Sequence, residues 1–141
     1  MTLKNTDNEY RITVSNRQTI DSETDTIEET AYGNYTEKNG KQYITYKTEN
    51  DGDKISSMIK IDGNEILIKR TGSVNSSMTY KVDTKKEFLY HLPYGTVPRE
   101  IETQRKVSKL DENGGTIELV YTLMVQGEKY FNDMKITVSK R

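Results

Sequence analysis

Apolar and polar residues alternate with a period of two along most of the chain. Tyr10, Ile12 and Val14, for example, are each followed by a polar residue. Successive side chains of a β-strand point to opposite faces, so this alternation predicts strands with one buried and one solvated face. Runs of this kind cover residues 10–15, 24–35, 42–49, 55–61, 66–70, 74–80, 88–92, 99–107, 117–125 and 130–138. The pattern therefore predicts about ten strands.

Short turns rich in glycine separate these runs. Asn39-Gly40 is a two-residue hairpin signal, because both positions of a type I′ turn need positive φ. Gly33 interrupts the second run and predicts a β-bulge there. Consecutive strands joined by hairpins can close into a barrel, which removes exposed edges. We therefore predict an all-β protein, a single antiparallel up-and-down β-barrel of about eight to ten strands, with residues 1–141 as one domain.

The composition favours the same class. The chain of 141 residues has a single alanine but 12 isoleucines, 18 threonines and 10 tyrosines, and branched or aromatic side chains pack well on a pleated sheet. It has no cysteine, which excludes disulfides, thiolate metal sites and cysteine nucleophiles. No run is apolar enough for a signal peptide or a membrane span, so we expect a cytoplasmic protein without a membrane partner.

The segment Tyr90–Pro98, YHLPYGTVP, contains the only histidine and both prolines of the chain. Pro93 suits the second position of a β-turn, and Gly95 suits the fourth. His91 has no cysteine partner, and the chain has no Gly-x-Ser-x-Gly motif. We interpret the segment as a sharp turn, with His91 on the strand face that Leu89 shares. A ligand contact for the histidine is the alternative.

Charged residues give little support for a metal site or for nucleic-acid binding. Asp51 and Asp53 lie close together, but the other ligands of a calcium loop are missing. Glu28 and Glu29 are adjacent on a strand and should point to opposite faces. The 21 basic and 22 acidic side chains leave a net charge of −1, unlike the basic footprint of a nucleic-acid-binding domain. We therefore predict no metal, no cofactor and no nucleic-acid partner.

Four segments carry a resemblance to a known family. In chain order they are Arg70–Gly72 (RTG), Ser77–Tyr80 (SMTY), Leu92–Gly95 (LPYG) and Gly114–Leu123 (GGTIELVYTL). Their order and spacing resemble the YwiB-like family of uncharacterised bacterial proteins over nearly the whole chain. The resemblance implies a calycin-like, lipocalin-type β-barrel and a cytoplasmic bacterial protein. It implies no activity.

Along each strand, alternate positions carry the apolar side chains that should face inward. Polar residues at these positions give the best indication of a site. The inward faces would contain Tyr46, Ser57, Arg70, Ser76, Tyr80, Thr103, Arg105, Tyr121 and Asn132 beside the apolar residues. A dry core would not favour two arginines, because a buried guanidinium without a partner is costly. We predict that Arg70 and Arg105 meet a negative group of a ligand. The predicted walls of this pocket are Tyr46, Tyr80 and Tyr121.

The two arginines also have an alternative explanation, in which both lie near strand ends and reach water or pair with Glu29. Two classes of function therefore stay open. The first is a barrel that holds a small anionic or amphipathic ligand. The second is a protein-interaction or assembly module without a small ligand, with the chain as a monomer or homodimer. An enzyme ranks third, because the sequence shows no nucleophile, metal cluster or phosphate loop.

Overall fold

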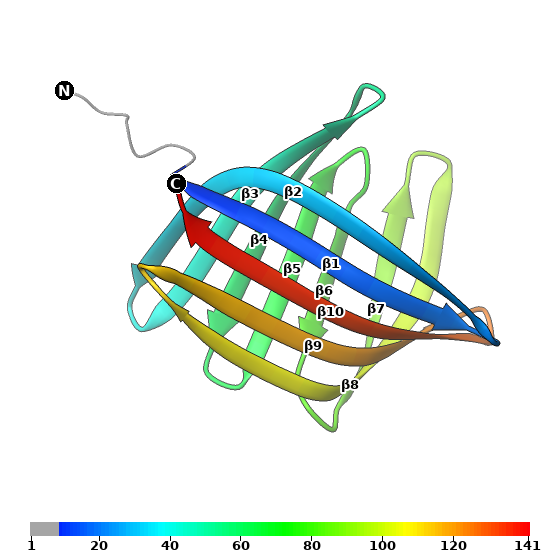
Figure 1. The fold of residues 1–141 in the computed structure, drawn as a ribbon. Helices are drawn as coiled ribbons and strands as arrows, with labels where there is room; N and C mark the ends of the chain where they lie inside the picture. The colour runs from blue at the N-terminus through cyan, green and yellow to red at the C-terminus, as the bar shows by residue number, and fades with distance from the viewer. Residues whose placement is uncertain (1–8) are drawn as a thin grey trace.

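Ten antiparallel strands make up the fold, and the all-β prediction is confirmed. The computed structural model describes residues 9–141, and this part of the chain contains no helix. The strands are β1 (Tyr10–Ile20), β2 (Glu23–Lys38), β3 (Lys41–Asn50), β4 (Asp53–Asp62), β5 (Glu65–Gly72), β6 (Ser76–Tyr80), β7 (Lys85–Leu92), β8 (Gly95–Asp111), β9 (Gly114–Val125) and β10 (Glu128–Lys140). Figure 1 shows them curving into a nearly closed barrel.

The strands form one sheet in the order β6-β5-β4-β3-β2-β1-β10-β9-β8-β7. All neighbouring strands are consecutive in the chain except β1 and β10, which pair along almost their whole length. The first and last strands therefore lie side by side in the middle of the sheet (Figure 1). The seam of the barrel lies instead between β6 and β7, where Asn75 and His91 form an isolated bridge. The predicted up-and-down barrel is confirmed.

Apolar side chains fill the middle of the barrel, and polar contacts close one of its ends. The apolar residues with no exposed surface are Ile12, Ile44, Ile59, Ile66, Ile101, Ile117 and Leu119. At the closed end, the hydroxyl of Tyr10 donates to the carbonyl oxygen of Glu112 at 2.7 Å. Gln42 of β3 donates to the carbonyl oxygen of Leu110 in β8 at 2.6 Å. Because β3 and β8 lie far apart in the sheet order, the second bond spans the barrel.

A β-bulge changes the side-chain alternation in β8. The register of β8 against β9 shifts between Thr103 and Arg105, which makes Gln104 the extra residue. One extra residue exchanges the faces of all the residues that follow it. Lys106 therefore pairs with the buried Leu119, whereas Arg105 lies on the outer face.

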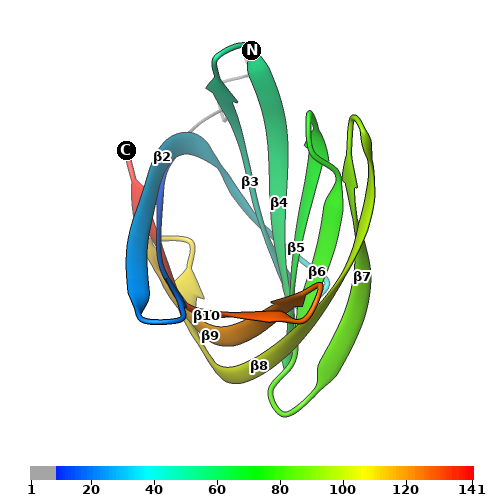
Figure 2. The same ribbon diagram turned by 90° about the vertical axis from the view of Figure 1, so that its right-hand side faces the viewer.

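Gly33 is a point of close strand contact, and the predicted bulge at this residue is wrong. The ladder of β2 with β1 and the ladder of β2 with β3 both end at Gly33, and neither shows a register shift. A Cβ atom at this position would collide with the carbonyl oxygen of Thr45 in β3. Pairing between β2 and β3 covers only residues 33–38 of β2, while residues 23–32 pair with β1 alone. The barrel is therefore split along its side, and Figure 2 shows the β3–β4 hairpin diverging from β2.

The turn between β7 and β8 has the predicted position. β8 begins at Gly95, and Pro93 and Tyr94 form the turn before it. The side chain of His91 is exposed, and its Nδ1 lies 3.1 Å from Oγ1 of Thr96. The prediction of a turn is therefore confirmed, with the histidine on the outer face of the barrel.

Candidate functional site

Several polar side chains are buried in the barrel wall. They are Ser57, Ser76, Thr103, Thr122 and Asn132. All except Thr122 lie at the inward positions that the alternation predicts. Burying a polar group costs free energy unless it is hydrogen-bonded. This concentration of buried polar groups therefore distinguishes one part of the interior from the isoleucine core.

Arg70 is the cation of this polar region. It lies on β5, and its register partners are Ser57 on β4 and Ser76 on β6. Burial lowers the pKa of its guanidinium, but the neighbouring Tyr46 and Tyr80 raise it, and the pKa ends above its ordinary value. Arg70 is therefore a permanent positive charge inside the barrel.

Glu29 influences Arg70 without forming an ion pair with it. Among the groups of residues 9–141 that raise the pKa of Arg70, Glu29 is the one carboxylate. It faces inward from β2, opposite Val14 of β1. No carboxylate of residues 9–141 lies within 4.0 Å of the Arg70 guanidinium. Because a guanidinium offers five N–H donors in a fixed fork, Arg70 has the capacity to bind an additional anion.

The three tyrosines that were predicted as walls are neighbours of Arg70. The rings of Tyr80 and Tyr121 meet edge to face, with centroids 4.9 Å apart. Burial raises the pKa of Tyr80 well above its ordinary value, and burial also raises the pKa of Tyr46 and of Tyr121. All three hydroxyls are therefore neutral at neutral pH. Each tyrosine combines a broad apolar ring with one polar atom, which suits the wall of a binding site.

Arg105 lies outside the barrel, so its predicted place in the pocket is wrong. Its side chain is 56% exposed, and its Nη1 lies 3.0 Å from Oε1 of Glu118. The bulge at Gln104 is the physical reason. Without the extra residue, Arg105 would face inward like Ile101, and the bulge turns its side chain to the outer face. The interior site therefore contains Arg70 without Arg105.

Two buried hydroxyls in the same region have no hydrogen-bond partner within residues 9–141. They are Oγ of Ser76 on β6 and Oγ1 of Thr103 on β8. Ser76 pairs with Arg70 in register, and Thr103 pairs with Tyr121. Buried polar atoms in proteins are normally hydrogen-bonded. The two hydroxyls therefore mark positions at which a bound molecule can donate or accept a hydrogen bond.

An amide cluster borders this region, and two of its members were missed in the sequence. Oδ1 of Asn132 accepts from Nδ2 of Asn16 at 3.1 Å and from Nε2 of Gln18 at 2.9 Å. The alternation predicts that Asn132 faces inward, whereas Asn16 and Gln18 lie beyond the predicted strand of residues 10–15. Asn16 and Gln18 lie two and four residues after Val14 on β1, so they share its inward face. A predicted strand that ran beyond residue 15 would include both.

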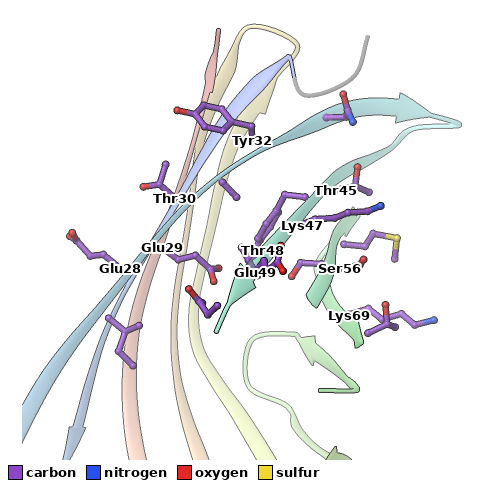
Figure 3. Close-up of a pocket in the computed structure, with 18 residues that line it drawn as sticks. Glu28, Glu29, Thr30, Tyr32, Thr45, Lys47, Thr48, Glu49, Ser56 and Lys69 are labelled. Carbon is purple, nitrogen blue, oxygen red and sulfur yellow. The ribbon is translucent and has the colours of Figure 1, made fainter. Parts of the chain in front are cut away.

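A groove on the side of the barrel leads to the Arg70 region, and we call it the side groove. It lies between residues 27–34 of β2 and residues 45–50 of β3, with a volume of about 1130 Å³. This is large enough for a small molecule, since typical ligand pockets measure about 300–1,000 Å³. Glu29, Tyr46 and Ser57 line the groove and are also neighbours of Arg70. Figure 3 shows Glu29 projecting into the groove, whereas Glu28 points away.

Two other kinds of feature are absent from residues 9–141. This part of the chain has no group of three or more His, Asp or Glu side chains that is placed to hold a metal ion. It also has no helix of the length and apolarity needed to cross a bilayer. The Arg70 region therefore stays the principal candidate site.

The chain is similar to known proteins along most of its length. A family model described as "Domain of unknown function (DUF1934)" matches residues 12–138. Among curated proteins, the chain is similar to the "Uncharacterized beta-barrel protein YwiB" of Bacillus subtilis (strain 168), with 28% identity over 118 residues and 83% of each chain covered. Among solved structures, it is similar to the ywiB protein from Bacillus subtilis, with a TM-score of 0.88 and 25% identity. That match covers 94% of this chain and 91% of the other.

Proposed function

The chain belongs to the family described as "Domain of unknown function (DUF1934)", as the resemblance predicted, and we propose that it binds a small anionic or amphipathic molecule inside the barrel. The main support for the proposal is that Arg70 has no carboxylate partner in the described chain. Its side chain is partly buried, with no carboxylate of residues 9–141 at contact distance of the guanidinium. A ligand carboxylate, sulfonate or phosphate would fill this position, because arginine binds such groups through paired hydrogen bonds.

The neighbours of Arg70 have distinct roles in this proposal. The hydroxyls of Ser76 and Thr103 form hydrogen bonds with the ligand, since both are buried without a partner in the described chain. The edge-to-face rings of Tyr80 and Tyr121 contact its apolar part. The ligand enters through the side groove, whose wall includes neighbours of Arg70. A ligand held inside an antiparallel barrel is also the binding mode of lipocalins, and likeness to them is part of the proposal.

Binding is a better proposal than catalysis. The side chains that surround Arg70 are mainly hydroxyls, and burial raises the pKa of each of its three tyrosines. These groups are therefore poor general bases at neutral pH. They can donate hydrogen bonds and orient a bound molecule.

The test measures how Arg70→Met changes binding of an amphipathic anion. Anilinonaphthalene sulfonate is a suitable probe, because it joins one sulfonate to an aromatic body and reports binding by fluorescence. We expect Arg70→Met to weaken binding by about 1–3 kcal/mol, the range for loss of a hydrogen bond to a charged group. Native mass spectrometry of freshly purified protein would show in parallel whether a natural ligand is retained.

Arg105→Met is the matched control, because it removes the same functional group from the outer face. We expect it to bind the probe as the wild type does. Cooperative thermal unfolding of both variants shows that the fold is intact, since a loosened core also binds this dye. Equal affinity of the wild type and a folded Arg70→Met variant would exclude the interior site.

The proposal also includes where the protein acts and in what state. We expect a cytoplasmic protein, monomeric or homodimeric, with no nucleic-acid or membrane partner. The nearly balanced charge, −1 overall, supports the absence of a nucleic-acid partner. Cell fractionation and analytical ultracentrifugation test location and oligomeric state.

A further inference from the structure

One edge of β2 is unpaired over much of its length. Residues 23–32 pair with β1 on one side and with no strand of the described chain on the other. Across the side groove, residues 47–50 of β3 pair with β4 alone. Backbone N–H and C=O groups on a free edge can form hydrogen bonds with another extended chain. The side groove therefore lies between two strand edges that can both accept a partner.

The free edge of β2 is strongly acidic. Residues 23–32 contain Glu23, Asp25, Glu28 and Glu29 but no lysine or arginine. Ile27 lies among them with 60% of its surface exposed. Opposite charges on neighbouring strands stabilise their pairing, and like charges oppose it. A strand that pairs here therefore gains from basic residues and from an apolar residue that contacts Ile27.

The same charges disfavour a second copy of this protein as the partner. Two β2 edges pairing with each other would bring four acidic residues of one copy next to four of the other. Natural proteins use charged residues on strand edges to prevent such self-association. Charge complementarity thus selects a basic polypeptide over a homodimer at this edge.

We propose that the free edge of β2 is a docking site for an extended, basic segment of another polypeptide. The segment adds to the sheet as a strand along the free edge of β2, and it lies in the side groove where it passes residues 27–32; this binding mode is known as β-augmentation. Its backbone pairs with residues 23–32, and its lysines or arginines lie near Glu23, Asp25 and Glu28. This inference goes beyond the small-molecule function, because it assigns a macromolecular partner to the edge of β2 rather than to the interior around Arg70.

A labelled decapeptide of lysine and threonine, with lysines on both faces of the strand that it forms, tests the docking site by fluorescence anisotropy. We expect saturable binding to the full chain and no binding of the matching glutamate–threonine peptide. The triple variant Glu23→Gln, Asp25→Asn and Glu28→Gln should weaken binding about tenfold, because three favourable cross-strand charge pairs are lost. The control variant Glu37→Gln, Glu87→Gln and Glu128→Gln neutralises three exposed acids elsewhere and should bind as the wild type does.

Two peptides, each N-methylated on one of the two alternating sets of residues, distinguish strand pairing from simple charge attraction. Alternate residues of a strand direct their N–H groups to opposite edges. Methylation of the set that faces β2 should abolish binding. If both methylated peptides bind as the unmodified peptide does, or if both triple variants bind equally, the proposal is wrong.

Two further measurements complete the test. Association of the protein with itself through β2, detected by ultracentrifugation and abolished by the triple variant, would replace the basic peptide with a second copy as the occupant. The Arg70→Met variant should bind the peptide normally, because Arg70 does not contact the free edge of β2 in the proposed mode. Failure of the peptide to bind would therefore leave the interior anion site unaffected.

Discussion

Burial controls the charge state of individual side chains in the barrel. Tyr80 is almost completely buried, and burial raises its pKa well above the ordinary value. Arg70 lies beside it, and its pKa also ends above the ordinary value. The interior thus contains a fixed cation among neutral hydroxyls. This arrangement favours an anionic group over a cationic one.

The Tyr80 hydroxyl should lose its proton only at a pH above the ordinary pKa of tyrosine, and its ionisation should destabilise the fold. Because its folded pKa is raised above the unfolded value of about 10, the stabilisation is complete below pH 10 and is lost as the pH rises through the raised pKa. The difference in tyrosinate absorbance between the wild type and Tyr80→Phe measures this titration. We expect its midpoint above pH 10. A midpoint at the ordinary value would show that the ring is not buried.

Two strands depart from regular pairing, and each departure has a local cause. At Gly33, the absence of a side chain lets β2 contact the backbone of β3 closely, and pairing of the two strands begins there. At Gln104, an extra residue in β8 faces a single residue of β9 and reorients everything that follows. The first departure helps to shape the side groove. The second determines which charged side chains of β8 reach the interior.

Deletion of Gln104 should be tolerated, whereas deletion of Val107 should not. Without Gln104, β8 pairs regularly, with Arg105 still outside and Lys106 still inside. The expected cost is about 1–3 kcal/mol, because the buried Thr122 hydroxyl loses Gln104 as its partner. Without Val107, the inward side chain of Leu110 turns outward, and its contact with the core is lost. Thermal unfolding of both deletion variants checks this, and equal stability would contradict the proposed bulge.

The whole barrel is closed unevenly around its circumference. The β1–β10 pair seals the barrel with the two ends of the chain, and side chains close one end of the interior. At the β6–β7 seam the described residues form isolated bridges in place of a continuous ladder: Asn75 pairs with His91 through two backbone hydrogen bonds of 3.1 and 2.9 Å, and Val82 pairs with Thr103 of β8. The split between β2 and β3 stays open as the side groove. Ligand access and strand docking are therefore both assigned to the weakly closed side.

A disulfide across the seam should stabilise the barrel. Asn75 and His91 form a hydrogen-bonded antiparallel pair, for which a Cα–Cα distance of about 5.5 Å is typical and suits a disulfide. Asn75→Cys with His91→Cys in this cysteine-free chain should raise the free energy of unfolding by about 3 kcal/mol when oxidised. Denaturant titrations with and without reductant measure the gain. Equal stability with and without reductant would show that the seam is not closed there.

His91→Gln alone should leave binding of anilinonaphthalene sulfonate unchanged.

Much of the fold and part of the site could be predicted from the sequence. The alternation located ten strands, the turn at Pro93 and the inward side chains of Arg70, Tyr46, Tyr80 and Tyr121. These features depend on the period of a strand and on turn chemistry, which are local properties. Arg105 was misplaced because a bulge exists only relative to the partner strand. No local pattern around Gln104 indicates it.

The class of the protein, its strands and a polar inward face centred on Arg70 can be predicted from the sequence, because each follows from residues close together in the chain. Three features become evident only in the folded barrel: Arg105 lies outside, β1 pairs with β10, and β2 separates from β3 on the N-terminal side of Gly33. These features depend on pairing between residues far apart in the sequence. The side groove and the free acidic edge of β2 arise from that pairing, because a strand edge is free only when no neighbour covers it.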